Sequence, residues 1–295
     1  MKAIEKRPIT PEIQKIARRA IDLYANERAE EAFELLQKGV DEHSHVRLFR
    51  LLARLRVFFG DEAGATEILK QVLPICWKPG FWELAQVGSR QGYAVKSEQH
   101  KLLYFPVRKC ACTSMYNFMA SIDGQKRQGE EIHDEQDHEL VTFDTLRQDY
   151  VSYKTALVVR DPIARVRSFY KGNIEKREHL VRDTNGKESF YGLKTRPCYE
   201  EFLANFDAYR RTFITVRNHT DALVAFAGEN INNFDVVVNV AGVSELQNKL
   251  AASMGIDIEP LHEMKSDGET FELTEAENAL RSLYEEDYQL FGEYF

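Results

Sequence analysis

Two short apolar segments, each followed at once by basic residues and a helix start, constrain this chain more than any other feature. The first, residues 102–107, leads into residues 108–114, a loop with a lysine near its beginning and two hydroxyls near its end. The second, residues 155–159, runs into Arg160, an aspartate and a proline. Short apolar runs predict buried strands, and proline after an aspartate favours the first turn of a helix. We therefore predict an α/β fold in which two strands pass through polar loops into helices.

The first loop has the chemistry of an anion site. Thr113 and Ser114 stand where the following helix begins, so their hydroxyls join its unpaired N–H groups and the positive end of its dipole. Lys109 adds a full positive charge nearby. The glycines of the nucleotide-binding P-loop are missing, since no glycine occurs between Tyr93 and Gly124. The loop therefore predicts a phosphate or sulfate cradle of another kind.

The second strand end is also positive. Between Arg160 and Arg177 there are six basic and two acidic residues, a net charge of +4, to which Arg165 and Arg167 contribute. The planar guanidinium of arginine suits a doubly charged phosphate, and Ser168 lies about two helical turns after Arg160. Taken alone, such a strand end is also typical of a salt-bridged turn. Two of them predict one ligand with two separated anionic groups, held at the carboxyl ends of neighbouring parallel strands.

The composition excludes several classes of protein. The 295 residues are 43% hydrophobic and 29% charged, which is an ordinary globular mixture. The longest apolar runs are far shorter than the ~20 residues that span a bilayer, and the first ten residues lack the apolar core of a signal peptide. Four cysteines are too few for a disulfide scaffold. We expect a cytoplasmic protein with free thiols that does not span a membrane.

The net charge of −8 argues against a general nucleic-acid binder. The acidic residues are unevenly spread, because residues 255–295 carry twelve acids against two bases. The remainder of the chain is therefore close to neutral, which leaves room for a local anion site.

The first third of the chain is expected to be helical. Thr10 precedes a proline, a helix start signal, and apolar residues then recur at helical spacing. A weak repeat relates Ala29 to Ala63 and Leu35 to Leu69, each pair 34 residues apart, which is the period of tetratricopeptide helix hairpins.

We predict two domains: a helical, tetratricopeptide-like subdomain over residues 1–97 and a second domain over residues 98–295. Between them, Pro79 and Gly80 give a turn signal that breaks the helical pattern. The helices serve either to pack on the rest of the chain or to bind a partner protein, and the sequence leaves both readings open.

Three segments of the second domain resemble the sulfotransferases, specifically the carbohydrate sulfotransferase family (sulfotransferase family 2). Residues 106–114 resemble its 5′-phosphosulfate loop, of the form P-K-x-x-C/S-T-S, although Arg108 precedes Lys109 where many members have proline. Residues 159–170 resemble its 3′-phosphate segment, R-[DE]-P-x-x-R-x-x-S. Residues 283–291 resemble the closing helix of many members. The N-terminal helices have no part in the resemblance.

The resemblance implies a P-loop-like parallel sheet flanked by helices, and a transfer reaction. The donor would be 3′-phosphoadenosine-5′-phosphosulfate (PAPS). An acceptor hydroxyl would attack its sulfur in line, and 3′,5′-adenosine bisphosphate (PAP) would leave without help from a metal. Lys109 would lie on the oxygen that bridges phosphorus and sulfur. The other donor-binding residues implied are Arg108, Cys112, Thr113 and Ser114 at the 5′ end, Arg160 and Ser168 at the 3′-phosphate, and Arg217.

An acceptor hydroxyl needs a general base, and histidine suits neutral pH. His138 lies 22 residues before Arg160, and uronyl 2-O-sulfotransferase relatives have a catalytic histidine at a similar distance before this strand. We predict His138 as the base, with His133 second and Glu135 or Glu139 as carboxylate alternatives. A solvated charged loop is the structural alternative. A metal site is disfavoured because the spacing matches no standard zinc pattern.

The leading hypothesis is a sulfotransferase that acts on a hydroxyl of a glycan or similar acceptor. Residues 171–199, rich in Lys, Arg and Tyr, are the expected acceptor region. One alternative is a nucleotide-kinase-like phosphotransferase, which the missing glycine-rich loop disfavours. Another is a non-catalytic helical-repeat adaptor with a degenerate nucleotide-binding domain. Intact Lys109, Arg160 and Ser168 favour an enzyme.

Overall fold

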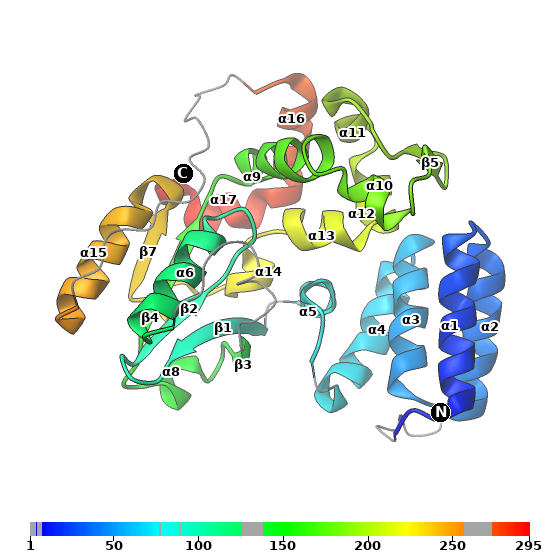
Figure 1. Cartoon of the computed structure of the whole chain (residues 1–295), viewed down its shortest axis with the longest axis horizontal. Helices are drawn as coiled ribbons and strands as arrows, with labels where there is room; N and C mark the ends of the chain where they lie inside the picture. The colour runs from blue at the N-terminus through cyan, green and yellow to red at the C-terminus, as the bar shows by residue number, and fades with distance from the viewer. Residues whose placement is uncertain (1–3, 5–7, 77, 89, 126–137, 257–272) are drawn as a thin grey trace. The chain divides into compact units, whose positions relative to one another are not determined.

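The computed structural model describes residues 4, 8–76, 78–88, 90–125, 138–256 and 273–295. Two units interleave along the chain (Figure 1). The first, the helical unit, comprises Met1–Val87 and Ile174–Arg217, and the second, the sheet unit, comprises Gly88–Asn173 and Asn218–Phe295. The structure thus groups the middle segment 174–217 with the N-terminal helices, a grouping that no sequence pattern indicated.

Two of the N-terminal helices, α1 and α4, begin at a residue whose side chain caps them, and Thr10 does so as the sequence predicts. Thr10 Oγ1 accepts a hydrogen bond from the Ile13 N–H at 3.3 Å, and Asp61 Oδ1 accepts one from the Gly64 N–H at 2.9 Å. The helices are α1 (Pro11–Ala25), α2 (Ala29–His43), α3 (Val46–Phe58), α4 (Glu62–Val72), the 3₁₀ helix η1 (Leu73–Ile75) and α5 (Phe81–Val87).

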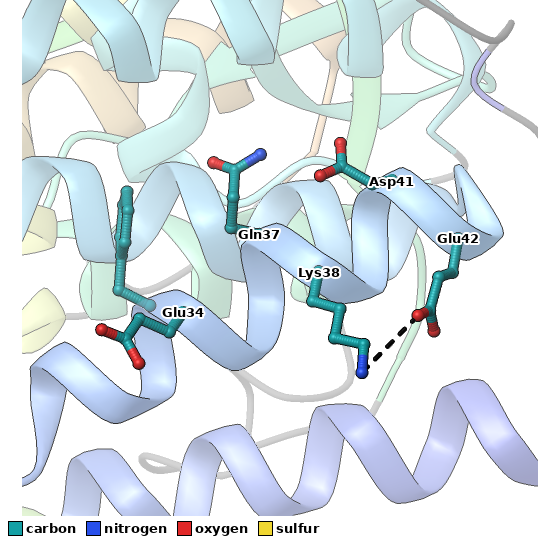
Figure 2. A pocket seen from close by; sticks show the side chains of 6 residues that line it. Glu34, Gln37, Lys38, Asp41 and Glu42 are labelled. Atoms are coloured by element: carbon teal, nitrogen blue, oxygen red, sulfur yellow. Dashed lines mark ion pairs between the residues drawn. The ribbon is translucent and has the colours of Figure 1, made fainter.

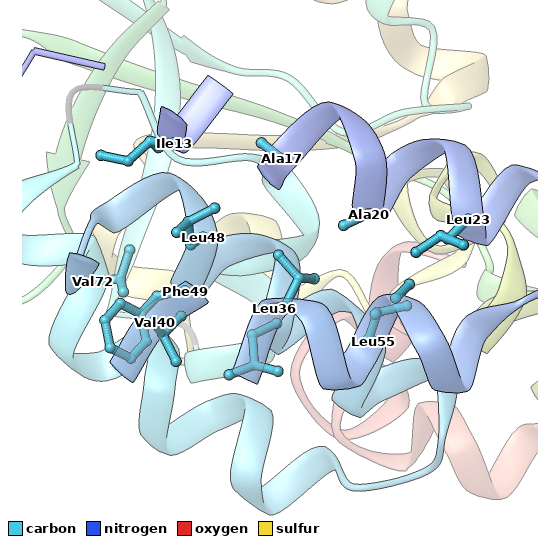
Figure 3. Packing of buried hydrophobic residues seen from close by; sticks show 12 residues of the cluster. Ile13, Ala17, Ala20, Leu23, Leu36, Val40, Leu48, Phe49, Leu55 and Val72 are labelled. Atoms are coloured by element: carbon cyan, nitrogen blue, oxygen red, sulfur yellow. The ribbon is translucent and has the colours of Figure 1, made fainter. Parts of the chain in front are cut away.

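Helices α1, α2 and α3 share an apolar core with the end of α4 (Figure 3). Ala17 and Ala20 are almost fully buried, and their small side chains let α1 approach its neighbours closely. The larger side chains Leu36, Leu48 and Leu52 are at most 2% exposed. Burial of each leucine is worth about 1.5–3 kcal/mol, so this core stabilises the association of the helices.

The segment 174–217 is fixed to the N-terminal helices by a partly buried arginine. Arg54 donates to the carbonyl oxygens of Arg211 and Thr212, both at 2.6 Å, at the end of α12. Burial lowers the pKa of Arg54 to about 10, and the carbonyls at a helix C-terminus compensate the charge. The elements of the segment are α10 (His179–Asp183), β5 (Ser189–Phe190), β6 (Leu193–Lys194), α11 (Tyr199–Ala204), α12 (Phe206–Thr212) and α13 (Ile214–Thr220), which runs on into the sheet unit.

The sheet unit is built on a five-stranded sheet. Its strands, in spatial order, are β3 (His138–Thr142), β1 (Gln91–Ser97), β2 (Leu102–Phe105), β4 (Lys154–Val159) and β7 (Val236–Asn239). Strands β2, β4 and β7 are parallel, with Phe105 opposite Leu157 and Val159 opposite Asn239. The carboxyl ends of β2 and β4 therefore meet at one edge of the sheet, as predicted.

Strand β1 corrects two expectations. It runs antiparallel to both β2 and β3, so the sheet is mixed rather than purely parallel. Residues 91–97, assigned from sequence to the helical subdomain, form this strand, the second in the order of the sheet. The sequence analysis missed it because alternating burial is weak here, where four consecutive residues are buried on both faces.

Helices cover both faces of the sheet, so the predicted α/β class is confirmed. Helix α6 packs on β1 and against α15, whereas α14 reaches β1 from the opposite face, beside Gly92. The remaining elements are α6 (Cys112–Ile122), α8 (Leu146–Asp149), α9 (Pro162–Phe169), the π-helix η2 (Tyr170–Glu175), α14 (Val224–Ala227), η3 (Ile231–Asn233), η4 (Val240–Gly242), α15 (Val243–Met254), α16 (Glu275–Leu280), η5 (Arg281–Tyr284), α17 (Glu285–Phe291) and η6 (Gly292–Tyr294).

The C-terminal elements close over the start of α14. The buried carboxylate of Asp287 accepts hydrogen bonds from the N–H groups of Leu223 and Val224, at 2.7 and 3.0 Å. The hydroxyl of Tyr288 donates to Asp161 at 2.8 Å, at the start of α9. Within the described part of the chain, no helix combines the length and apolar character needed to cross a bilayer.

Candidate anion-binding site

The loop between β2 and α6 adopts a strained backbone. Lys109 and Ala111 have φ values of +66° and +53°, in the left-handed region that residues other than glycine rarely occupy. Each such residue costs about 1–3 kcal/mol and persists where the surroundings fix it, commonly at functional sites. Ala111 is the N-cap of α6, and its methyl group cannot accept a hydrogen bond from the first turn. Thr113 and Ser114 lie in that turn, so the predicted helix-start geometry is present.

Arg160 reaches this loop from the neighbouring strand. It follows β4 directly, and its Nη1 donates to the Lys109 carbonyl at 3.4 Å. Asp161 accepts from the Ala164 N–H at 2.8 Å, and so begins α9 as the sequence predicts. Burial lowers the pKa of Arg160. A partly desolvated cation gains more from an anionic ligand than an exposed one does, so the geometry suits anion binding.

The Lys109 ammonium has a defined place. Its Nζ donates to the side-chain oxygen of Asn173 at 3.1 Å. Asn173 belongs to the π-helix that follows α9 and is 3% exposed. The sequence analysis missed this residue, because a π-helix breaks the 3.6-residue period on which helix faces are read.

Arg165, counted from the sequence among the positive charges near Arg160, is buried within the protein. It is 1% exposed and donates to the carbonyl oxygens of Arg108 at 3.4 Å and Asp221 at 3.0 Å. A third contact, at 3.4 Å, goes to the carbonyl of His219. The buried guanidinium therefore holds the anion loop on the segment that precedes α14. The sequence does carry a signal of this burial. Arg165 lies four residues before the apolar Phe169 on α9, and residues four apart share a helix face.

Arg167 is likewise engaged within the protein. It makes a two-pronged ion pair with Glu277, whose carboxylate is fully buried, and its Nη2 lies 2.6 Å from Glu277 Oε2. The pair connects α9 with α16, so Arg167 serves packing as well as charge. Ser168, the next residue, is partly exposed on α9.

His138 lies at the start of β3 and not in a solvated loop. Its Nε2 is 2.9 Å from the hydroxyl of Tyr116 in α6. Burial raises the pKa of Tyr116, so the phenol keeps its proton and fixes the imidazole ring. Glu139 accepts a hydrogen bond from Tyr150 and lies 2.7 Å from Lys96 Nζ. The other predicted bases, His133 and Glu135, lie outside the described residues.

A second histidine lies beside the anion loop. His219 Nε2 is 3.5 Å from Arg108 Nη1, and its ring stacks on Phe169 with centroids 5.0 Å apart. The sequence pattern gave no sign of this proximity, because 111 residues separate His219 from Arg108.

Arg217, predicted to bind the donor, belongs to the helical unit. It is 6% exposed, donates to Gln86 Oε1 at 2.8 Å and lies 3.8 Å from Glu62. These contacts account for its burial, and its role toward the donor stays a prediction.

The cysteines of the loop are thiols. Burial raises the pKa of Cys110 to about 12, and Cys112, which begins α6, also has a raised pKa because of burial. Across the described residues, no group of three or more His, Cys, Asp and Glu side chains is placed to hold a metal ion.

The helical unit carries an open hollow of about 420 Å³ along α2 (Figure 2). Its lining includes an ion pair between Lys38 and Glu42 at 3.8 Å. The other lining residues are Phe33, Glu34, Gln37 and Asp41. None of them is among the predicted donor-binding residues, so this hollow has no part in the anion site.

One comparison with known proteins gives a match. A family model with the description "Sulfotransferase family" matches residues 93–294, more than half of the chain. The match begins within β1 and includes both strand ends of the anion site. No curated protein and no solved structure matches the chain.

Proposed function

The chain belongs to the sulfotransferase family, and on this premise we propose that it moves a sulfuryl group from PAPS to a hydroxyl of a carbohydrate or similar acceptor. One observation carries the proposal. The ends of two neighbouring parallel strands bring Lys109 and Arg160 together, with the Arg160 guanidinium 3.4 Å from the Lys109 carbonyl. A nucleotide with phosphate groups at its 5′ and 3′ positions matches two cationic strand ends.

The residues at the two strand ends would bind different parts of the donor. Thr113 and Ser114, with the N–H groups of the first turn of α6, would hold the 5′-phosphate. Arg160 and Ser168 would hold the 3′-phosphate, where a guanidinium and a hydroxyl supply directional donors. Lys109 would lie between them, over the bond that breaks.

The proposed reaction needs positioning and charge neutralisation more than covalent chemistry. The acceptor oxygen forms a bond to sulfur while the bond from sulfur to the 5′-phosphate oxygen breaks. The acceptor proton passes to a base, and the negative charge that develops on the leaving PAP is neutralised by Lys109 and the loop amides. The proposal includes no metal.

His138 remains the proposed base. Its support is the orienting contact with Tyr116, because a general base is effective when a third group fixes its ring. His219 is a second candidate, favoured by its place 3.5 Å from Arg108 in the anion loop.

The acceptor and any protein partner are further proposals. Residues 171–199 carry basic and aromatic side chains, which suit an acidic glycan. The N-terminal helices, with a 34-residue repeat offset, suit a protein partner.

Calorimetry with PAP tests the proposed function. We expect PAP to bind with a micromolar Kd, and 5′-AMP, which lacks the 3′-phosphate, to bind at least ~10-fold more weakly. Turnover is then measured with labelled PAPS against a panel of polysaccharide and small hydroxyl acceptors. If PAP does not bind while ATP with Mg²⁺ does, the phosphotransferase alternative replaces the proposal. PAP binding without turnover on any acceptor would favour the adaptor.

A further inference from the structure

We propose that Asn173, with Gly172 beside it, is a positioning residue that holds the Lys109 ammonium for sulfuryl transfer; this inference rests on the proposed function. The contact is direct, since Lys109 Nζ donates to Asn173 Oδ1 at 3.1 Å. Asn173 is 3% exposed, so its amide is fixed by the surrounding protein. A buried acceptor of this kind defines where the ammonium lies.

The chemistry of the amide suits this task. Lysine has a flexible four-carbon stem, and an ammonium without an anchor samples many positions. A neutral amide oxygen anchors the ammonium and leaves its charge intact. A carboxylate at the same place would pair with the ammonium and would repel the phosphates of the donor. Asparagine therefore positions Lys109 without competing with an anionic ligand.

The π-helix explains how Asn173 comes to this place. Residues Tyr170–Glu175 form it directly after α9, the helix that carries Ser168. One additional residue in a helix rotates the following side chains by about 100°. Isolated π-helical turns are rare in proteins as a whole, but those that do occur often lie at functional sites. The wide turn thus directs one side chain toward Lys109 while α9 keeps its own register toward the 3′-phosphate.

Gly172 leaves room for the ammonium. A Cβ placed on Gly172 would lie 3.3 Å from Lys109 Nζ, closer than ordinary van der Waals contact. A side chain here would displace the ammonium or exclude the ligand atom that it contacts. Glycine and asparagine together shape the position of one lysine nitrogen.

The test compares kcat with PAP affinity in variants of the full chain. Asn173→Ala should lower kcat by ~10- to 100-fold, because a misplacement of about 1 Å costs rates of this order. The Kd for PAP should change by less than ~3-fold, since Thr113, Ser114, Arg160 and the loop amides, which would hold its two phosphates, are unchanged in this variant. Asn173→Asp should lower kcat and also weaken PAP binding, by ~10-fold or more. Lys249→Ala, at an exposed position on α15 that lies outside the anion site and the proposed acceptor region, is the control and should change neither value.

Each outcome decides the inference. A fall in kcat with PAP affinity and melting temperature near those of the wild type supports positioning. Equal losses of kcat and PAP affinity in Asn173→Ala mean a general structural role and overturn it. Wild-type kcat in Asn173→Ala also overturns it, while PAP binding and turnover by the wild type leave the proposed function standing. A wild-type chain that binds no PAP overturns both.

Discussion

The buried ion pair between Arg167 and Glu277 gives a sharp stability prediction. Glu277 has no exposed surface, whereas the Arg167 side chain is 20% exposed. The charged side chain that remains without its ion-pair partner therefore differs between a variant of Arg167 and a variant of Glu277. Arg167→Met leaves a fully buried carboxylate, and Glu277→Gln leaves a guanidinium that still reaches water. The two variants should differ in cost although both remove the same pair.

The expected loss in the free energy of unfolding depends on the contacts that remain around each charged side chain. Removal of one partner of a buried pair costs about 3–5 kcal/mol. The N–H and hydroxyl of Thr274 still donate to Glu277, at 3.0 and 3.2 Å, which places Arg167→Met near the lower end, at about 3 kcal/mol. Glu277→Gln should cost about 1.5 kcal/mol, the lower end of the range for a hydrogen bond to a charged group. The double variant Arg167→Met/Glu277→Leu should cost about 2 kcal/mol less than the sum of the single effects.

Chemical denaturation of the full chain measures these differences, and calorimetry should show a Tm lowered by roughly 6–12 °C for Arg167→Met. The matched control is Lys249→Met. Lys249 forms a pair with Glu245 at 2.7 Å, but both side chains are more than 70% exposed. The control should leave stability unchanged within error. Equal costs for the two buried variants, or no coupling between them, would refute the reasoning from burial.

Three further outcomes are expected. Lys109→Ala should abolish turnover while PAP still binds, as calorimetry and labelled-donor assays would show, and unchanged turnover would remove the lysine from the mechanism. His138→Ala should lower kcat by ~10²-fold or more; if only His133→Ala or His219→Ala does so, that residue is the base. Burial raises the pKa of Asp287 above its usual 3.8. The folded chain then takes up this proton at higher pH than the unfolded chain, so the group stabilises the fold at low pH and loses that effect as pH rises. The stability of the wild type relative to Asp287→Asn should therefore fall as pH rises above 3.8, and a constant difference would contradict the shift.

The parts of the fold that depend on local chemistry could be predicted from the sequence. Thr10, Asp61 and Asp161 begin helices because their side chains accept from N–H groups three residues on, a short-range effect visible in the residue types. The strand ends before Lys109 and Arg160 could be found because short apolar runs and the loops that follow them are contiguous. Their meeting at one sheet edge followed from parallel pairing.

The parts that depend on tertiary packing could not be predicted. Whether Arg165 faces water or a backbone carbonyl depends on the segment near Asp221, which is distant in sequence. The place of Asn173 depends on a π-helix, for which residue types carry no clear signal. The grouping of residues 174–217 with the N-terminal helices depends on contacts between residues distant in sequence, such as those of Arg54.

The central claim is that the two cationic strand ends hold opposite ends of one nucleotide. A crystal structure of the chain with PAP is the most direct measurement. We expect the 5′-phosphate on the first turn of α6, at Thr113 and Ser114, with Lys109 beside it, and the 3′-phosphate on Arg160 and Ser168. Phosphates bound away from either strand end, or PAP held by only one of them, would contradict it.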